Sequence, residues 1–107
     1  MPRWLPRVLK RIQELAAARR VLFTLKARRE LAALGIGLDE EDACDLLASL
    51  TGEDSAGRLA SVVTGEWMYV FKPTLAGAVL YVKLTLRIDC IVVSFHEDEG
   101  GYEQEGA

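Results

Sequence analysis

The sequence has few of the residues and motifs that indicate metal, redox or phosphate-loop chemistry. It contains one histidine and two cysteines, and Cys44 and Cys90 stand far apart with no CxxC pair. A single histidine excludes a multi-histidine metal site, and such isolated cysteines are typical of buried thiols. The chain also lacks a glycine-rich phosphate loop, an HExxH motif and a nucleophile elbow. We therefore predict no metal and no cofactor, so that an enzyme of this sequence would work with its own side chains.

Long apolar runs are also absent. No run approaches the roughly 20 residues that span a bilayer, and Pro2, Arg3, Pro6 and Arg7 stand where a secretory signal needs its apolar core. We therefore expect a cytoplasmic protein with no membrane partner. The 107 residues, half of them hydrophobic, fit one domain. We expect this domain to cover residues 1–97, followed by an acidic, glycine-containing and disordered tail at residues 98–107.

The charges are distributed unevenly along the chain. Residues 1–30 carry nine Lys/Arg against two Glu, a net of +7, whereas the remainder carries four basic residues against fourteen acidic ones, a net of −10. A basic N-terminal third indicates contact with a polyanion. Solvated faces of two helices would explain the same counts, and from the charges alone this is the simpler interpretation.

Helical spacing of apolar residues predicts three helices in the first half of the chain. Pro6 suits the first turn of the first helix, which ends at an arginine pair before residues 21–23, a short strand or a linker. Thr24 is the expected N-cap of the second helix and Gly35 its left-handed C-cap. Asp39 is the expected N-cap of the third helix, and the acidic residues after it compensate the helix dipole more simply than they form a metal site.

After residue 54 the apolar period changes to two, which is typical of half-buried strands. Strands are predicted at residues 58–63 and 67–72, followed by a hairpin over residues 79–96. Because the helices come first and consecutive strands pair, the sequence predicts an α+β fold. In this fold the N-terminal helices pack on one face of an antiparallel β-meander of four strands.

The hairpin carries the most informative polar residues. A two-residue turn at Ile88-Asp89 brings the apolar residues of both strands to one face. The predicted pairs are then Tyr81 with His96, Lys83 with Ser94, and Thr85 with Val92. The apolar face would hold Val82, Leu84 and Leu86 from one strand and Ile91, Val93 and Phe95 from the other. The polar face then joins the only histidine to a tyrosine and a lysine, groups that move protons and carry positive charge.

Several segments, taken in order and spacing, resemble the MqsR-type toxins of bacterial toxin–antitoxin systems. They are Leu34-Gly35, Leu38-Asp39, Cys44, Leu46-Leu47, Trp67, Val70-Phe71-Lys72-Pro73, Leu80-Tyr81-Val82-Lys83-Leu84-Thr85 and Ile91-Val92-Val93-Ser94-Phe95. The resemblance covers about residues 30–98. It implies a RelE-like fold and an endoribonuclease that cleaves mRNA, free or on the ribosome. It also implies a cognate antitoxin, expected to bind zinc and to carry a DNA-binding domain.

The family's functional residues correspond only in part. Tyr81 matches a tyrosine of the family's active site, and His96 takes the place of its usual catalytic lysine. Met68 stands where the family commonly has an active-site glutamine. Arg58 is the basic residue nearest to the position of another family lysine. The resemblance therefore supports the fold more strongly than the complete catalytic set.

The candidate residues suit cleavage of RNA without a metal. The reaction needs a base for the 2′-OH, an acid for the leaving oxygen, and positive charge at the phosphorus. A histidine, with an ordinary pKa of about 6.5, transfers protons at neutral pH better than a lysine of about 10.4. We predict His96, Tyr81, Arg58 and Lys83 as catalytic residues. Lys72, Trp67, Tyr69 and Arg87 are the predicted RNA-binding residues, the aromatic ones by stacking on bases.

Each of these residues also has a simpler explanation. Trp67 is more commonly a core residue, and Lys83 and Arg87 are typical of a solvated sheet face. Two other functions also remain open. One is a non-catalytic module that binds an antitoxin or nucleic acid, which the missing glutamine and lysine favour. The other is a structural interaction domain, which requires that the tail or helices cover the polar face of the hairpin.

Overall fold

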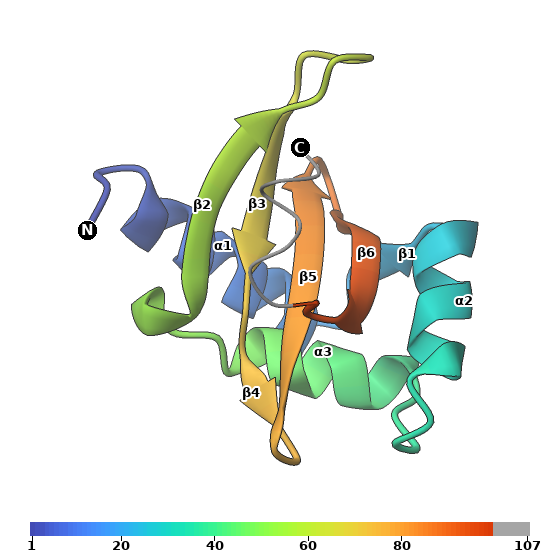
Figure 1. Cartoon of the computed structure of the whole chain (residues 1–107). Coiled ribbons are helices and arrows are strands. Elements are labelled where there is room, and N and C mark those ends of the chain that lie inside the picture. The colour runs from blue at the N-terminus through green and yellow to red at the C-terminus, as the bar shows by residue number, and fades with distance from the viewer. Residues whose placement is uncertain (100–107) are drawn as a thin grey trace.

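A computed structural model describes residues 1–99 as helices followed by a sheet (Figure 1). The elements are α1 (Leu5–Ala17), β1 (Val21–Phe23), α2 (Leu25–Ala33), α3 (Glu40–Ala48), a 3-10 turn (Gly52–Asp54), β2 (Ser55–Ala60), β3 (Trp67–Phe71), β4 (Thr74–Leu75), β5 (Ala78–Leu86) and β6 (Cys90–Glu97). The predicted α+β class, with N-terminal helices packed on a sheet, is confirmed. None of the helices in this part of the chain is long and apolar enough to cross a membrane.

The sheet is mixed, which corrects the prediction of a purely antiparallel meander. Its strands lie in the order β1-β6-β5-β3-β2, and the short β4 pairs with β5. All neighbours are antiparallel except β1, which runs parallel to β6 and pairs Val21 with Cys90 and Phe23 with Val92. Three residues are too few to show a period of two, so the sequence could not distinguish this strand from a linker.

Strand β2 begins three residues earlier than predicted. It covers Ser55–Ala60, whereas the apolar pair Val62 and Val63 lies in the β2–β3 connection, where both side chains are almost fully exposed. Apolar residues are common on the surface, and here they gave a false strand signal.

The helix ends agree with their sequence signals. The Thr24 hydroxyl accepts a hydrogen bond from the Ala27 N–H (3.1 Å) at the start of α2. Asp39 and Asp42 exchange side-chain to backbone hydrogen bonds of 2.8 and 3.1 Å, which form a capping box on α3. Gly35 follows α2 with a φ of +72°, as a left-handed cap requires. These caps depend on neighbours in sequence, so local patterns predict them well.

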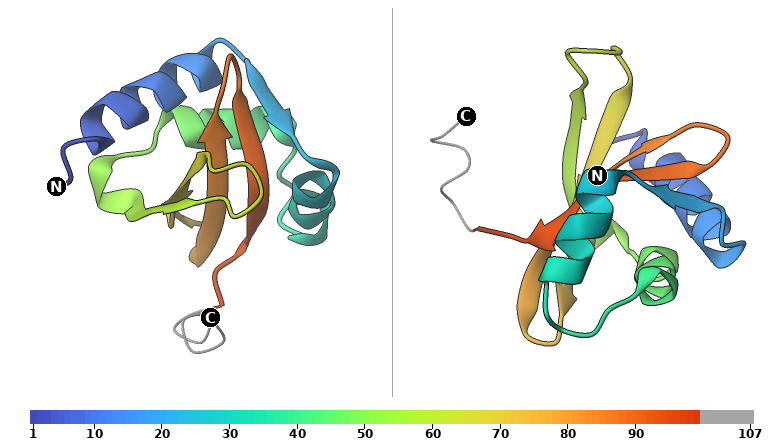
Figure 2. Two further views of the ribbon diagram at one scale, coloured as in Figure 1. Left: turned by 90° about the horizontal axis from the view of Figure 1, so that it is seen from above. Right: turned by 90° about the vertical axis from the view of Figure 1, so that its right-hand side faces the viewer.

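The core lies between one face of the sheet and helices α1 and α3, which Figure 2 shows on the same side. Fully buried side chains include Ile12 of α1, Leu47 of α3, Phe71 of β3 and Val82 of β5. Both cysteines are buried free thiols, as predicted. Helix α2 packs against β6 at the edge of the sheet. The face of the sheet that points away from α1 and α3 is called the open face below.

The β5–β6 hairpin follows the predicted register only in the half that lies away from its turn. Tyr81 pairs with His96 and Lys83 with Ser94, but Thr85 pairs with Ile91 instead of Val92. An extra residue at Val93 forms a bulge, and the connection contains three residues rather than two. Since a bulge reverses the side-chain alternation, Cys90 and Val92 face the core before it and Phe95 after it. The prediction that Ile91 and Val93 face the core is therefore wrong.

Candidate active site

The open face gathers polar side chains from β5 and β6. Tyr81 and Lys83 point to this face because their neighbours Leu80, Val82 and Leu84 are buried on the other. Their partners His96 and Ser94 lie beside them across the hairpin. Together with Lys26, Asp98 and Glu99, these four residues line a cavity of about 260 Å³. Three predicted site residues therefore meet in one cavity, and a cation from α2 joins them.

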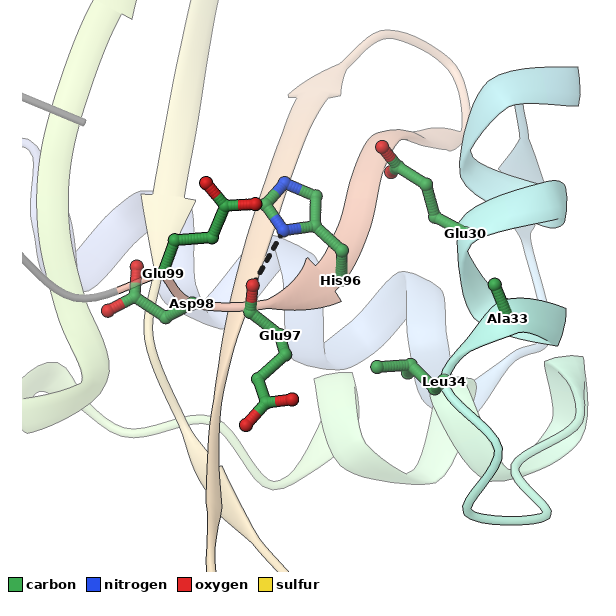
Figure 3. Close-up of a pocket in the computed structure, with 7 residues that line it drawn as sticks. All are labelled: Glu30, Ala33, Leu34, His96, Glu97, Asp98 and Glu99. Atoms are coloured by element: carbon green, nitrogen blue, oxygen red, sulfur yellow. Dashed lines mark hydrogen bonds between the residues drawn. The ribbon is translucent and has the colours of Figure 1, made fainter. Parts of the chain in front are cut away.

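The rings of Tyr81 and His96 stack on one another, and we call this pair the histidine–tyrosine cluster. Their centroids are 5.0 Å apart and their planes are inclined by 12°. The Nδ1–H of His96 donates to the Glu97 carbonyl oxygen at 2.8 Å (Figure 3). Because a carbonyl can only accept, Nδ1 carries the hydrogen, and Nε2 holds the free lone pair of the neutral ring. The ring is thus oriented with its basic nitrogen away from its own backbone.

Lys26 and Glu30, one turn apart on α2, were not predicted. The Lys26 ammonium lies 2.9 Å from the Ser94 hydroxyl and 3.0 Å from the Glu30 carboxylate. Glu30 also accepts the Phe95 N–H at 2.9 Å. Since β1 pairs only as far as Val92, the Glu30 carboxylate satisfies a backbone donor on the unpaired edge of β6. No sequence motif indicates this contact, because it joins two elements far apart in the chain.

The surroundings of Glu30 affect its protonation. Partial burial alone would raise the pKa of this carboxyl group. The hydrogen bond from the Phe95 N–H, together with the ion pair to Lys26, outweighs that effect and holds the pKa below its ordinary value. Glu30 is therefore ionised at neutral pH, and it fixes the end of Lys26 beside the cavity.

A second cavity of about 600 Å³ adjoins the first on the side of α2. Glu30, Ala33 and Leu34 line it from the helix, opposite His96 and residues 97–99 (Figure 3). His96, Asp98 and Glu99 thus line both cavities. The Asp98 carboxylate lies 3.3 Å from the Lys72 ammonium, and the Asp98 N–H donates to the Val79 carbonyl at 2.8 Å. The predicted disordered tail starts at this residue, and its positions 100–107 lie outside the described part of the chain.

Of the predicted RNA-binding residues, only Lys72 is near the histidine–tyrosine cluster. The Lys72 ammonium is 6.0 Å from the Tyr81 ring centre. Arg87, directly after the end of β5, forms two hydrogen bonds with Glu66, at 2.7 and 2.9 Å. These bonds raise the pKa of Arg87 and lower that of Glu66. The charge of Arg87 therefore already has a partner.

The remaining candidates lie on the helix-covered face. Arg58 pairs with Tyr69 in the sheet, and Tyr69 pairs with the buried Leu84, so all three point away from the cavity. Tyr69 is buried against Trp4, with ring centres 5.4 Å apart. Trp67, for which a core position was the simpler expectation, has 45% of its surface exposed. Within residues 1–99, no three His, Cys, Asp or Glu side chains are grouped as metal ligands.

The fold and the comparison with known families assign the chain to a class. Residues 6–97 match a family model described as "Motility quorum-sensing regulator, toxin of MqsA". The protein is therefore a toxin of a toxin–antitoxin system. It belongs to the MqsR toxin family, which confirms the resemblance found in the sequence and implies an antitoxin partner of the MqsA type. No curated protein matches the chain closely enough to add a named relative.

Proposed function

We propose that this toxin is an endoribonuclease that cleaves mRNA in the cytoplasm, with its catalytic centre on the open face. The observation that supports this most directly is the histidine–tyrosine cluster beside Lys83 in a cavity of about 260 Å³. A proton-transferring ring, a hydroxyl and a cation within one cavity are the groups that RNA transesterification requires.

In the proposed mechanism, the 2′-oxygen of the RNA attacks the adjacent phosphorus. His96 Nε2 takes the proton from the 2′-OH, the new bond from the 2′-oxygen to phosphorus forms, and the bond to the 5′-oxygen breaks. The 5′-oxygen takes up a proton from the histidinium or from water, which leaves a 2′,3′-cyclic phosphate and a 5′-hydroxyl. Tyr81, stacked on His96, orients the 2′-OH or the phosphate through its own hydroxyl.

Two lysines are positioned to stabilise the negative charge that develops on the phosphoryl oxygens. Lys83 and Lys26 both line the cavity. Among residues 1–99 no carboxylate lies within ion-pair distance of Lys83, so its charge is available to a phosphate. Lys26 shares its charge with Glu30. We therefore assign the larger electrostatic contribution to Lys83 and a supporting one to Lys26.

A second candidate function is a non-catalytic module that binds the antitoxin or nucleic acid. The specific observation in its favour is that Asp98 and Glu99 line the same cavity as His96. Lys72 partly neutralises Asp98, but the carboxylates still repel a phosphodiester unless they move or take protons. Detection of cleavage products in vitro separates the two functions, because only the first one generates them.

For the antitoxin, we infer a zinc-binding protein with a DNA-binding domain that covers an exposed edge of the toxin. Strand β2 is the outermost strand of the sheet, and its Leu59 side chain is exposed. An unpaired edge of this kind is a common site for the addition of a partner strand. The proposed substrate is mRNA, either free or on the ribosome.

The test is cleavage of a defined RNA by wild-type protein and by His96→Ala. We expect His96→Ala to lower turnover by roughly 100- to 10,000-fold with an unchanged fold, since His96 lies outside the core. Glu53→Ala, an exposed change outside both cavities, is the matched control and should cleave like the wild type. Cleavage by wild type should continue in EDTA and leave cyclic phosphate ends. Expression of the wild type and of Glu53→Ala should arrest growth, and the antitoxin should relieve this arrest. Expression of His96→Ala should arrest growth much less.

Two results would contradict the proposal. Cleavage that stops in EDTA and returns with magnesium would indicate a bound metal instead of the histidine. Equal rates for His96→Ala and wild type, with the same pH dependence, would make His96 a surface residue. An absence of any cleavage, together with tight antitoxin binding, would favour the non-catalytic module.

A further inference from the structure

A second group of rings and charge lies on the helix-covered face of the sheet. The Arg58 guanidinium carbon is 3.8 Å from the ring centre of Trp67 and 4.9 Å from that of Trp4. We call these three residues the tryptophan–arginine cluster. Trp4 precedes α1, Arg58 lies on β2 and Trp67 begins β3. The cluster therefore forms where the start of α1 meets the outer strands of the sheet.

A bulge in β2 puts Arg58 on this face. Ser55 pairs with Phe71 and Arg58 with Tyr69, so β2 uses one residue more than β3 between the two pairs. Gly57, with a φ of +102°, takes up the irregularity. Without the extra residue, Gly57 would lie opposite Tyr69 and Arg58 would point to the open face. The bulge thus separates Arg58 from the His96 cavity and stacks it on the two indoles.

Stacking prepares the guanidinium to bind an anion. Its central carbon lies over two indole rings, which restricts the side chain, and its N–H groups can still bind a ligand. Within the described residues Arg58 has no carboxylate at ion-pair distance. The exposed part of Trp67 adds an aromatic surface at its side. A fixed cation beside an exposed indole is suited to a phosphate next to an unstacked base.

Further positive charge lies near the cluster. Arg7 follows Trp4 by three positions, so it projects from the same flank of α1. Arg3, Arg7 and Lys10 are exposed and, among residues 1–99, have no carboxylate partner. The acidic residues at the start of α3, by contrast, pair with arginines, as in Arg19 with Glu41 and Arg28 with Glu40. Part of the uncompensated positive charge of the described chain therefore lies beside the cluster, at Arg3 and Arg7.

We propose that the tryptophan–arginine cluster is a second RNA-binding site, which holds a single-stranded segment outside the catalytic cavity. Arg58 binds a phosphate through two N–H groups, and Trp67 stacks on a base. The proposal rests on the proposed function in taking RNA as the ligand. An acidic segment of a protein would satisfy the cations, but it would leave the exposed indole without a stacking partner, and the stacked geometry therefore favours RNA.

The experiment uses wild-type protein and a short single-stranded 2′-O-methyl oligonucleotide, which lacks the nucleophilic hydroxyl and cannot be cleaved by the proposed mechanism. Trp4 and Trp67 are the only two tryptophans in the chain, so intrinsic tryptophan emission reports directly on the cluster. We expect saturable quenching of this emission, and the same midpoint from the anisotropy of a fluorescein-labelled oligonucleotide.

Substitutions then test the individual contacts by anisotropy. Arg58→Ala and Trp67→Ala should each weaken binding about tenfold, and Arg58→Ala should lower the salt dependence of the affinity by about 0.7 in log–log slope. Arg58→Lys, which keeps the charge without the planar stack, should fall between Arg58→Ala and wild type. Arg29→Ala removes an exposed arginine that, like Arg58, has no carboxylate at ion-pair distance within the described residues, and it is the matched control for charge. Thermal unfolding of each variant verifies the fold.

The inference is wrong if Arg58→Ala and Arg29→Ala bind the oligonucleotide equally well, or if saturation leaves the tryptophan emission unchanged. It is also wrong if the antitoxin quenches the emission and RNA does not, because the surface would then belong to the protein partner. Because the oligonucleotide cannot be cleaved, these outcomes do not depend on whether the toxin cleaves RNA.

Discussion

Each face of the sheet carries a nitrogen-containing side chain next to aromatic rings, and the two groups differ in their capacity for proton transfer. On the open face, His96 stacks on Tyr81 in a cavity. On the helix-covered face, Arg58 stacks on Trp67 and Trp4 at the surface. An imidazole exchanges protons near neutral pH, whereas a guanidinium remains charged. The first stack can therefore take part in proton transfer, and the second can only attract and orient.

The two clusters also differ in the charged residues that surround them. Asp98 and Glu99 lie at the histidine–tyrosine cluster, so acids and bases face one another in its cavity. In the described chain no carboxylate pairs with Arg58. A resemblance in ring stacking is therefore a poor guide to function. The titratable group and the cavity distinguish the proposed catalytic centre from the proposed binding surface.

The largest expected effect that separates the two clusters is a change of pH optimum. His96→Lys restores the residue that the family usually has, but a lysine transfers protons poorly at neutral pH because its ordinary pKa is about 10.4. We expect turnover to fall by about 100-fold at neutral pH and the pH optimum for cleavage to rise. Arg58→Lys should raise KM and leave the pH optimum unchanged. Initial rates across a pH series measure both.

Two outcomes would weaken this comparison. If His96→Lys kept the wild-type pH optimum, the titrating group in cleavage would lie elsewhere on the open face, with Lys83 as the next candidate. If Arg58→Lys shifted the optimum instead, Arg58 would influence the catalytic step, and the sheet would not separate the two functions.

A smaller effect is expected from substitution of Glu30, which holds Lys26 beside the cavity on the open face. Glu30→Gln weakens the hydrogen bond to Phe95 and removes the ion pair with Lys26. It should lower the free energy of unfolding by about 1 kcal/mol at neutral pH. The native pKa of Glu30 lies below the ordinary value of 4.5, so its contribution is complete above that value and is lost as the pH falls through the native pKa. The difference between variant and wild type should therefore shrink in acid.

Urea unfolding at neutral and acidic pH measures this difference, with Glu14→Gln as the matched control, since Glu14 is exposed and lies 4.0 Å from Arg11. Cleavage should fall with Glu30→Gln, because Lys26 loses its anchor, whereas oligonucleotide binding at the tryptophan–arginine cluster should not change. An equal stability loss at both pH values would show that packing, rather than the ionised carboxylate, supplies the contribution of Glu30.

Local patterns predicted much of this structure. The caps at Thr24, Gly35 and Asp39 depend on residues a few positions away, and the outer half of the hairpin follows from strict alternation. These features yielded the fold class and the pairing of Tyr81 with His96. The family resemblance added the proposed role of this pair, which composition and spacing alone did not provide.

Two β-bulges, each with one extra residue, account for the main errors in the predicted side-chain directions. The bulge at Val93 reverses the facing of Ile91 and Val93, and the bulge at Gly57 moves Arg58 to the opposite face from His96. A period-two pattern cannot reveal an extra residue, because both parities remain plausible on either side of it. Lys26 was missed for a different reason, since its place beside Ser94 depends on packing between α2 and β6.

The smallest expected effect concerns the thiols. Burial, with a smaller contribution from nearby Cys44, raises the pKa of the Cys90 thiol to about 12, and burial also raises that of Cys44. Because the thiolate is the reactive form, iodoacetamide should modify neither cysteine in the native toxin at neutral pH, and both after unfolding in urea. Mass spectrometry of timed samples measures this. Since neither cluster uses a thiol, Cys90→Ala should leave oligonucleotide binding within twofold and alter only stability. Rapid modification of native Cys90 would instead show that the helices separate readily from the sheet, and the two faces could then no longer be treated as independent sites.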